Sequence, residues 1–192
     1  MCGIVGATTK TEIGHQLLNT LKLLEYRGYD SAGISLMSPS QTITTIKACG
    51  KIERLKEQFS QSKQTQGCVG IAHTRWATHG KPSEVNAHPF CSNDSVSIVH
   101  NGIIENASKL KSQLETDYHF QSETDSEVIA HLFHQKLACH HDPITALHQT
   151  SKELTGSYAT AILSDQHPNK IFFSCHNSPL VIAITEQGHS SL

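Results

Sequence analysis

Cys2 is placed where a cysteine can acquire unusual reactivity. Removal of the initiator methionine would leave this residue with both its thiol and a free α-amino group. The pKa of an α-amine is about 7.7–8.0 and that of a thiol about 8.5, so the amine can accept the thiol proton near neutral pH. Such a pair forms a nucleophile without a histidine. The alternative is that Cys2 is an ordinary small residue on a first strand.

Asn101 and Gly102 could serve such a nucleophile. A thiolate that attacks an amide or ester needs hydrogen-bond donors aimed at the oxyanion that develops. Asn101 offers a side-chain N–H, and Gly102 offers a backbone N–H with no Cβ beside it. An Asn-Gly pair is also typical of a type I′ hairpin turn. Both interpretations of this pair stay open.

Two further residues could bind a substrate with charged groups. Arg75, in the segment HTRWATHG, could grip a carboxylate through two parallel hydrogen bonds, or it could form a surface ion pair. Asp125 could hold an ammonium group, although an aspartate near a helix start commonly compensates the helix dipole. The substrate that matches these groups is an amino acid with a side-chain amide. Its amide would meet the thiol and the oxyanion donors, its carboxylate would bind Arg75, and its ammonium would bind Asp125. That substrate is glutamine or asparagine.

Hydrophobic periodicity predicts the elements that must position these residues. Helices are expected over residues 12–25 and 52–59, after a capping box at Thr124–Glu127, and after Asp142-Pro143, which supplies an N-cap and a first-turn proline. Strands are expected at 4–5, 32–37, 43–46, 68–72 and 96–99, followed by an antiparallel meander of 158–163, 171–174 and 180–184. Because helices and strands do not alternate strictly, the pattern favours a layered α+β fold.

Composition limits the class of protein. The 192 residues suit one domain, and the net charge of −2 argues against nucleic acid as the main partner. No apolar run is long enough to cross a membrane, and the first residues do not form a secretory signal. We therefore expect a soluble, cytoplasmic protein. The 14 histidines raise the question of a metal-binding protein, but the ligand spacing of known sites is missing, so we expect no metal and no other cofactor.

Several segments together resemble a known family. MCGIVG at 1–6 and HNG at 100–102 are similar to the class II glutamine amidotransferases, which are N-terminal-nucleophile hydrolases. The longer runs GIAHTRWATHGKPSEVNAHP (70–89) and SETDSEVIAHL (122–132) are more specific and resemble the glutaminase domain of the glucosamine-6-phosphate synthase family. The resemblance covers almost the whole chain. It implies an α+β fold, a four-layer αββα sandwich of two antiparallel sheets.

The resemblance also implies a role for each candidate residue. Cys2 would be the nucleophile, with its α-amine as general base, and Asn101 and Gly102 would form the oxyanion hole. Arg75 would bind the α-carboxylate of glutamine and Asp125 its α-amino group.

The remaining implied roles concern closure of the site. Trp76, Thr78 and His79 would lie on a mobile loop over the glutamine, with Trp76 placed to gate a path for ammonia. Arg27, in the segment YRGYDSAG, would lie beside the nucleophile and help to close the site.

The implied reaction is hydrolysis of glutamine to glutamate and ammonia. In that family, sugar isomerase domains follow the glutaminase domain and use the ammonia to convert fructose 6-phosphate to glucosamine 6-phosphate, and we expect the full-length enzyme to be a homodimer. We expect residues 1–192 to be a type 2 glutamine amidotransferase domain shortened at its C-terminal end, without the isomerase domains. The alternative is a non-catalytic glutamine-binding module, if Met1 is not removed.

Overall fold

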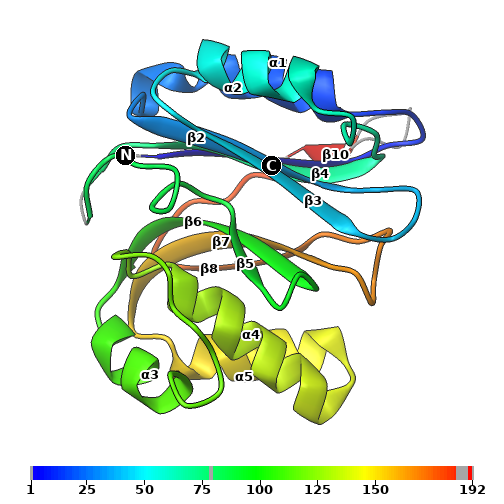
Figure 1. Cartoon of the computed structure of the whole chain (residues 1–192). Helices are drawn as coiled ribbons and strands as arrows, with labels where there is room; N and C mark the ends of the chain where they lie inside the picture. The colour runs from blue at the N-terminus through cyan, green and yellow to red at the C-terminus, as the bar shows by residue number, and fades with distance from the viewer. Residues whose placement is uncertain (1, 78–79, 185–189, 192) are drawn as a thin grey trace.

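The computed structural model describes residues 2–77, 80–184 and 190–191, and it shows two stacked β-sheets with helices on both outer faces (Figure 1). Helices α1 (Gly14–Leu23) and α2 (Ile52–Gln61) cover one sheet. Helices α3 (Ala107–Leu114), α4 (Glu127–His140) and α5 (Pro143–Glu153) cover the other. These four layers confirm the expected αββα sandwich.

The first sheet brings the beginning of the chain beside a later strand. Its order is β3-β2-β4-β1-β10-β9, with antiparallel neighbours throughout. The strands are β1 (Gly3–Thr8), β2 (Ser31–Met37), β3 (Ile43–Cys49), β4 (Val69–Arg75), β9 (Ala183–Ile184) and β10 (Ser190–Ser191). Gly3 pairs with Thr74, and Ser31 pairs with Arg75. The N-terminal end of β1 therefore lies against the C-terminal end of β4.

The second sheet has the antiparallel order β5-β6-β7-β8. Its strands are β5 (Phe90–Ser92), β6 (Val96–Ile104), β7 (Gly156–Ser164) and β8 (Phe172–His176). The expected three-stranded meander is wrong in its last strand. The segment 180–184 contributes only β9, which belongs to the first sheet and pairs with β10. Strand β10 pairs with the edge of β1 that faces away from β4. The backbone N–H and C=O groups on that edge require hydrogen-bond partners, which explains why this segment joins the first sheet.

The helix ends test two predicted caps. Asp142 caps α5, because its Oδ2 accepts from the Thr145 N–H at 2.7 Å, as expected. The capping box at Thr124–Glu127 is wrong: α4 begins at Glu127 itself, and Ser126 at the cap position makes no capping bond through its side chain. The Glu127 carboxylate instead accepts from the backbone N–H groups of Gln121 and Ser122, at 3.0 and 2.7 Å. The incoming loop thus takes the acceptor that a capping box would have used.

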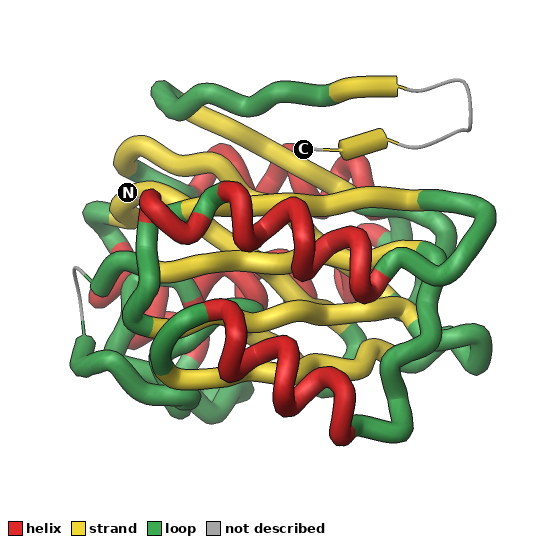
Figure 2. The backbone as a smooth tube through the Cα atoms, turned by 90° about the horizontal axis from the view of Figure 1, so that it is seen from above, coloured by secondary structure: helices red, strands yellow, loops and turns green. Residues whose placement is uncertain are grey.

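Each helical layer buries its apolar face on the neighbouring sheet. Leu17, Leu21 and Phe59 pack in one cluster with strand residues such as Ile34, whereas Ile129 and Phe133 pack in another with Ile98 and Ile162. Figure 2 shows α1 and α2 lying over the first sheet and running roughly along its strands. Among the described residues, no helix is long and apolar enough to cross a membrane. On this packed platform, Cys2 and Arg75 lie at strand ends, Asn101 and Gly102 lie within β6, and Asp125 lies in the loop before α4.

Candidate active site

Cys2 lies where segments from both sheets meet. Its backbone nitrogen is 3.4 Å from Oδ1 of Asn101 on β6, and its Sγ is 4.0 Å from the carbonyl oxygen of Trp76, just after β4. Arg27 donates from Nε to the Cys2 carbonyl at 3.0 Å. The register of β1 against β4 and the stacking of the sheets therefore bring together residues that are about 25, 75 and 100 positions apart in the chain.

The environment of the Cys2 thiol makes it a weak acid without help. Burial raises the pKa of this thiol, and the negative charge of Asp30 acts in the same direction. The positive charge of Arg75 opposes the rise only in part. Deprotonation of Cys2 near neutral pH consequently requires a base next to the sulfur, and an α-amine on the same residue would be such a base.

The turn interpretation of Asn101-Gly102 is wrong. Strand β6 continues through both residues to Ile104, pairing Asn101 with Ala159 and Gly102 with Tyr158 of β7. The long ladder with β7 overrides the local turn preference of this dipeptide. Gly102 has φ +145°, and a Cβ there would lie 2.0 Å from the Ser157 carbonyl oxygen. Only glycine fits, because the strand backbone of β7 passes directly against it.

A small cavity connects most of the candidate residues. Its volume is about 30 Å³, room for a water molecule or two and well below the range for ligand pockets, so a bound amino acid would need the lining to open. Its lining includes the predicted residues Cys2, Arg75, Trp76, Gly102 and Asp125. Thr124, Ser126, His88 and His100 complete the lining. A nucleophile, an oxyanion donor and groups of both charges thus line one small cavity that is partly open to solvent.

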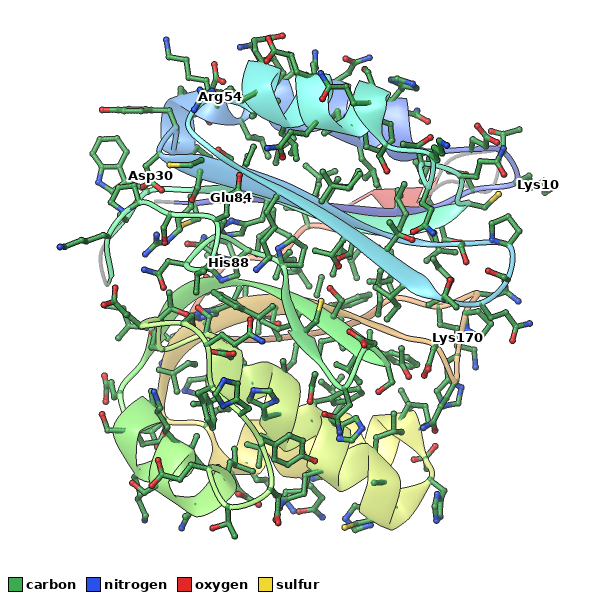
Figure 3. The ribbon with its side chains drawn as sticks, viewed as in Figure 1. Lys10, Asp30, Arg54, Glu84, His88 and Lys170 are labelled. Atoms are coloured by element: carbon green, nitrogen blue, oxygen red, sulfur yellow. The ribbon has the colours of Figure 1, made fainter. Side chains whose placement is uncertain are left out.

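Arg75 is buried rather than part of a surface ion pair. Its side chain is 4% exposed, and its Nη1 is 3.9 Å from Oδ1 of Asp30. Asp30 also accepts a hydrogen bond from the backbone N–H of Ala77, while its own N–H donates to the Arg75 carbonyl at 3.2 Å. Asp30 therefore fixes both Arg75 and the start of the loop after β4 (Figure 3).

The sequence did not predict this role of Asp30. The residue stands within the segment YRGYDSAG, directly before a strand that is buried along its whole length. A carboxylate at the entrance to a fully buried strand was the signal available, because such a charge requires partners.

Asp125 keeps an acceptor available toward the cavity. Its Oδ2 accepts from the Ile104 N–H at 2.8 Å, which fixes the carboxylate. Among the described residues, Oδ1 accepts only from the Ser126 hydroxyl, at 3.3 Å. Asp125 precedes α4 by two residues, so it is not simply part of the first helical turn. Its second oxygen can receive a hydrogen bond from a bound ammonium group.

Trp76, the first residue of the loop after β4, lies at the cavity. The indole is 46% exposed and packs edge-to-face on Tyr29, with 5.4 Å between ring centroids. Thr78 and His79 lie outside the described residues. The half-exposed indole at the cavity is in a suitable place to cover a ligand.

Three buried histidines beneath the site were not predicted. His73, His88 and His100 are each at least 96% buried, and His88 lies between the two sheets (Figure 3). Burial lowers the pKa of His73 to about 3 and that of His100 to about 4, and it holds the pKa of His88 well below its ordinary value. His73 Nε2 lies 2.9 Å from the His100 carbonyl, and His100 Nδ1 lies 2.7 Å from the Ser126 hydroxyl. These rings are neutral packing groups.

No group of three or more His, Cys, Asp or Glu side chains suited to a metal ion occurs within the described ranges.

Comparison with known proteins identifies the family. A family model described as a glutamine amidotransferase domain matches residues 73–189. The chain belongs to the glutamine amidotransferase domain family. The resemblance noted from MCGIVG, HNG and the longer runs is thereby confirmed.

Curated relatives of this amidotransferase domain carry the name glutamine–fructose-6-phosphate aminotransferase [isomerizing]. The protein of Idiomarina loihiensis is 44% identical over 185 residues, and that of Acinetobacter baylyi is 48% identical over the same length. The match covers 96% of this chain and 30% of each relative. For the Bacteroides thetaiotaomicron protein the values are 47% identity over 189 residues, 97% of this chain and 31% of the relative. The amidotransferase domain thus spans about a third of the length of these relatives.

Solved structures agree on the fold. Glutamine phosphoribosylpyrophosphate amidotransferase from B. subtilis, complexed with ADP and GMP, superposes with a TM-score of 0.81 at 25% identity. An allosteric regulatory enzyme of purine biosynthesis gives a TM-score of 0.82 at 26% identity. Each match covers 100% of this chain and 41% of the other.

Replacement of Asp30 should release the loop after β4. In Asp30→Ala the Ala77 N–H loses its acceptor, so we expect its amide to exchange with solvent at least about tenfold faster, equivalent to about 1.4 kcal/mol. Hydrogen exchange followed by NMR measures this directly. Asp117→Ala, at an exposed site, is the control and should leave Ala77 unchanged. Equal exchange in both variants would show that Asp30 does not hold the loop.

The buried histidines should make stability depend on pH. Their folded pKa values lie below the unfolded value of about 6.5, so their contribution is complete above pH 6.5 and is lost as the pH falls toward 4. The unfolding free energy of the parent should decrease as the pH falls. In His88→Gln we expect this decrease to be smaller by about 1.4 kcal/mol per pH unit, because one fewer proton is taken up on unfolding. Urea titrations from pH 7 to 4.5 measure the slope. The exposed His148→Gln should retain the parent slope, and an unchanged slope in His88→Gln would contradict the assignment.

Proposed function

We propose that this domain hydrolyses glutamine to glutamate and ammonia, with the Cys2 thiol as nucleophile and its α-amine as general base. The observation that carries the proposal is the 3.4 Å approach of the Cys2 nitrogen to Asn101 Oδ1. Once Met1 is removed, this nitrogen is the α-amine. An amide oxygen that accepts from it holds the amine beside the sulfur, where it can receive the thiol proton.

The same contact orients the oxyanion hole. Because Oδ1 of Asn101 faces the amine, its Nδ2 is left to donate elsewhere, and Gly102 on the same strand contributes its N–H to the cavity. We assign these two donors to the oxyanion that forms when the thiolate attacks the amide carbon of glutamine. Their position on a paired strand means that little reorganisation accompanies the reaction.

Two charged residues select glutamine as the substrate. Arg75 binds the α-carboxylate, positioned by Asp30, and Asp125 accepts from the α-ammonium through Oδ1. Asparagine carries the same groups, but its amide is one methylene closer to the α-carbon. We predict glutamine as the preferred substrate because the chain belongs to the glutamine amidotransferase domain family.

The reaction then proceeds in two steps. The Cys2 thiolate attacks the glutamine amide carbon and forms a tetrahedral intermediate. The α-amine of Cys2, now protonated, gives its proton to the departing nitrogen, so that ammonia leaves and a γ-glutamyl thioester remains. A water molecule, deprotonated by the same amine, attacks the thioester and releases glutamate. The Arg27 contact to the Cys2 carbonyl holds the nucleophile in place through both steps.

The loop after β4 closes the site in this proposal. Trp76 covers the bound glutamine and gates the exit of ammonia. The same role for Thr78 and His79, which lie outside the described residues, rests on the family resemblance alone. The exposed indole at the cavity supports this assignment for Trp76.

The domain is the ammonia-supplying part of a longer enzyme in this view. We propose that residues 1–192 form an N-terminal type 2 amidotransferase domain, and that fructose 6-phosphate is bound by sugar isomerase domains outside it, as the names of the relatives suggest. A homodimeric full-length enzyme in the cytoplasm belongs to the same proposal. A non-catalytic glutamine-binding module is not favoured, because the domain belongs to a family of amidotransferases.

Kinetics of two variants test the proposal. With Met1 removed, Cys2→Ala should abolish glutamate release, and Asn101→Ala should lower kcat by about 10²–10³ with little change in KM, because the oxyanion is present only in the transition state. Asn19→Ala on the exposed face of α1 is the matched control and should keep parent activity. Persistent hydrolysis by Cys2→Ala would refute the nucleophile, and a change in KM alone would refute the role of Asn101.

A further inference from the structure

A second, larger cavity lies outside the proposed active site. It has a volume of about 560 Å³ and opens to solvent. None of its lining residues lines the cavity at Cys2. Strands β3 and β5, at the same edge of the two sheets, form one side of it, and the beginning of α4 forms the other. Glu84, labelled in Figure 3, lies at its exposed rim. The open edge of the sandwich thus contains a space large enough for a small molecule.

Lys47 projects from β3 onto the floor of this second cavity. Its ammonium lies 4.9 Å from the centroid of the Phe90 ring, a cation–π contact. Within the described part of the chain, no carboxylate lies within 4 Å of this ammonium, and no side chain or carbonyl accepts a hydrogen bond from it. Burial lowers the pKa of Lys47, and the negative charges of Glu127, Glu84 and Cys91 oppose this fall only in part. The ammonium is thus buried with acidic groups nearby but none in direct contact.

The acidic residues around the cavity are engaged elsewhere or remain at its rim. Glu127 accepts three donors from Gln121 and Ser122 and lies 3.7 Å from His131 Nε2. Glu84 accepts from the Gln58 side chain at 3.2 Å. Asp94 is exposed in the turn after β5. The charge without a close partner at the floor is therefore the ammonium of Lys47.

A second polar atom at the floor also lacks a hydrogen bond. His131 is 4% exposed and lines the cavity, and its Nδ1 meets the Ser92 hydroxyl at 2.9 Å. Its buried Nε2 has no hydrogen-bond partner among the described residues, only the more distant Glu127 carboxylate. Buried polar atoms without partners are rare in folded proteins, so His131 is a second polar group at this cavity that could accept a further contact.

We propose that this cavity is a second ligand site that binds a small molecule through a carboxylate or phosphate group placed against Lys47. The anionic group supplies the counter-ion that the ammonium lacks. Hydroxyl or amino groups on the same molecule donate to Glu84 and Asp94 at the rim, which favours a polar metabolite over a simple ion. The site is independent of glutamine hydrolysis, since none of its residues touches the cavity at Cys2.

Titration of the 192-residue chain with inorganic phosphate and, separately, with succinate tests this site by NMR. We expect saturable shifts at the amides of Thr45, Lys47 and Cys91, and the stronger of the two anions identifies the preferred group. In Lys47→Met, binding should weaken at least about tenfold. Lys63→Met, at an exposed position, should change the affinity by less than about twofold. Shifts that do not saturate, or that persist in Lys47→Met, would overturn the proposal.

Thermal stability separates a binding lysine from a structural one. Replacement of an ammonium without a counter-ion by an apolar side chain of similar length should leave the melting temperature of Lys47→Met equal to or above that of the parent. Anions should raise the melting temperature of the parent and not that of the variant. A large fall in Lys47→Met would show that the ammonium is already compensated and would overturn the proposal. Lys47→Gln provides a second variant in which anion binding must also be lost.

Discussion

The whole site depends on the antiparallel pairing of β1 with β4. This ladder places Gly3 opposite Thr74 and so brings Cys2 and the residues after β4 to the same end of one sheet. Stacking of the second sheet then sets Asn101 of β6 against the Cys2 nitrogen. A slip of the β1 register by one residue would turn Cys2 to the opposite face, because side chains alternate along a strand. The chemistry is therefore built on backbone hydrogen bonds.

Burial shapes the reactivity of the groups around this end. It raises the pKa of the Cys2 thiol and keeps the imidazoles of His73 and His100 neutral. Because the histidines that line the cavity are neutral, Arg75 and Asp125 are the charged side chains of its lining. A ligand that carries both a carboxylate and an ammonium group can therefore contact one of them with each group. The same principle applies at the other cavity, where the ammonium of Lys47 is buried beside Phe90 and the carboxylates of Glu84 and Glu127 act on it only from a distance.

Sequence analysis predicted helices α1, α2, α4 and α5, most strands and the family, because periodicity and long motifs are local signals. It did not predict α3 (Ala107–Leu114). It failed where distant contacts decide. The ladder with β7 makes a strand of Asn101-Gly102, a pair whose local preference is a turn. Glu127 caps the preceding loop instead of completing a capping box. Asp30 and the three histidines acquire their roles only from burial and from partners in other strands, which spacing along the chain does not encode.

The measurement that tests the central claim most directly is intact mass and peptide mapping after treatment with 6-diazo-5-oxo-norleucine, a glutamine mimic that alkylates a reactive nucleophile. The account predicts loss of the Met1 mass, a single adduct and its location on Cys2, with glutamine slowing the labelling. An adduct on Cys49, Cys91 or another cysteine, or no adduct after removal of Met1, would contradict an N-terminal cysteine nucleophile in a glutamine pocket.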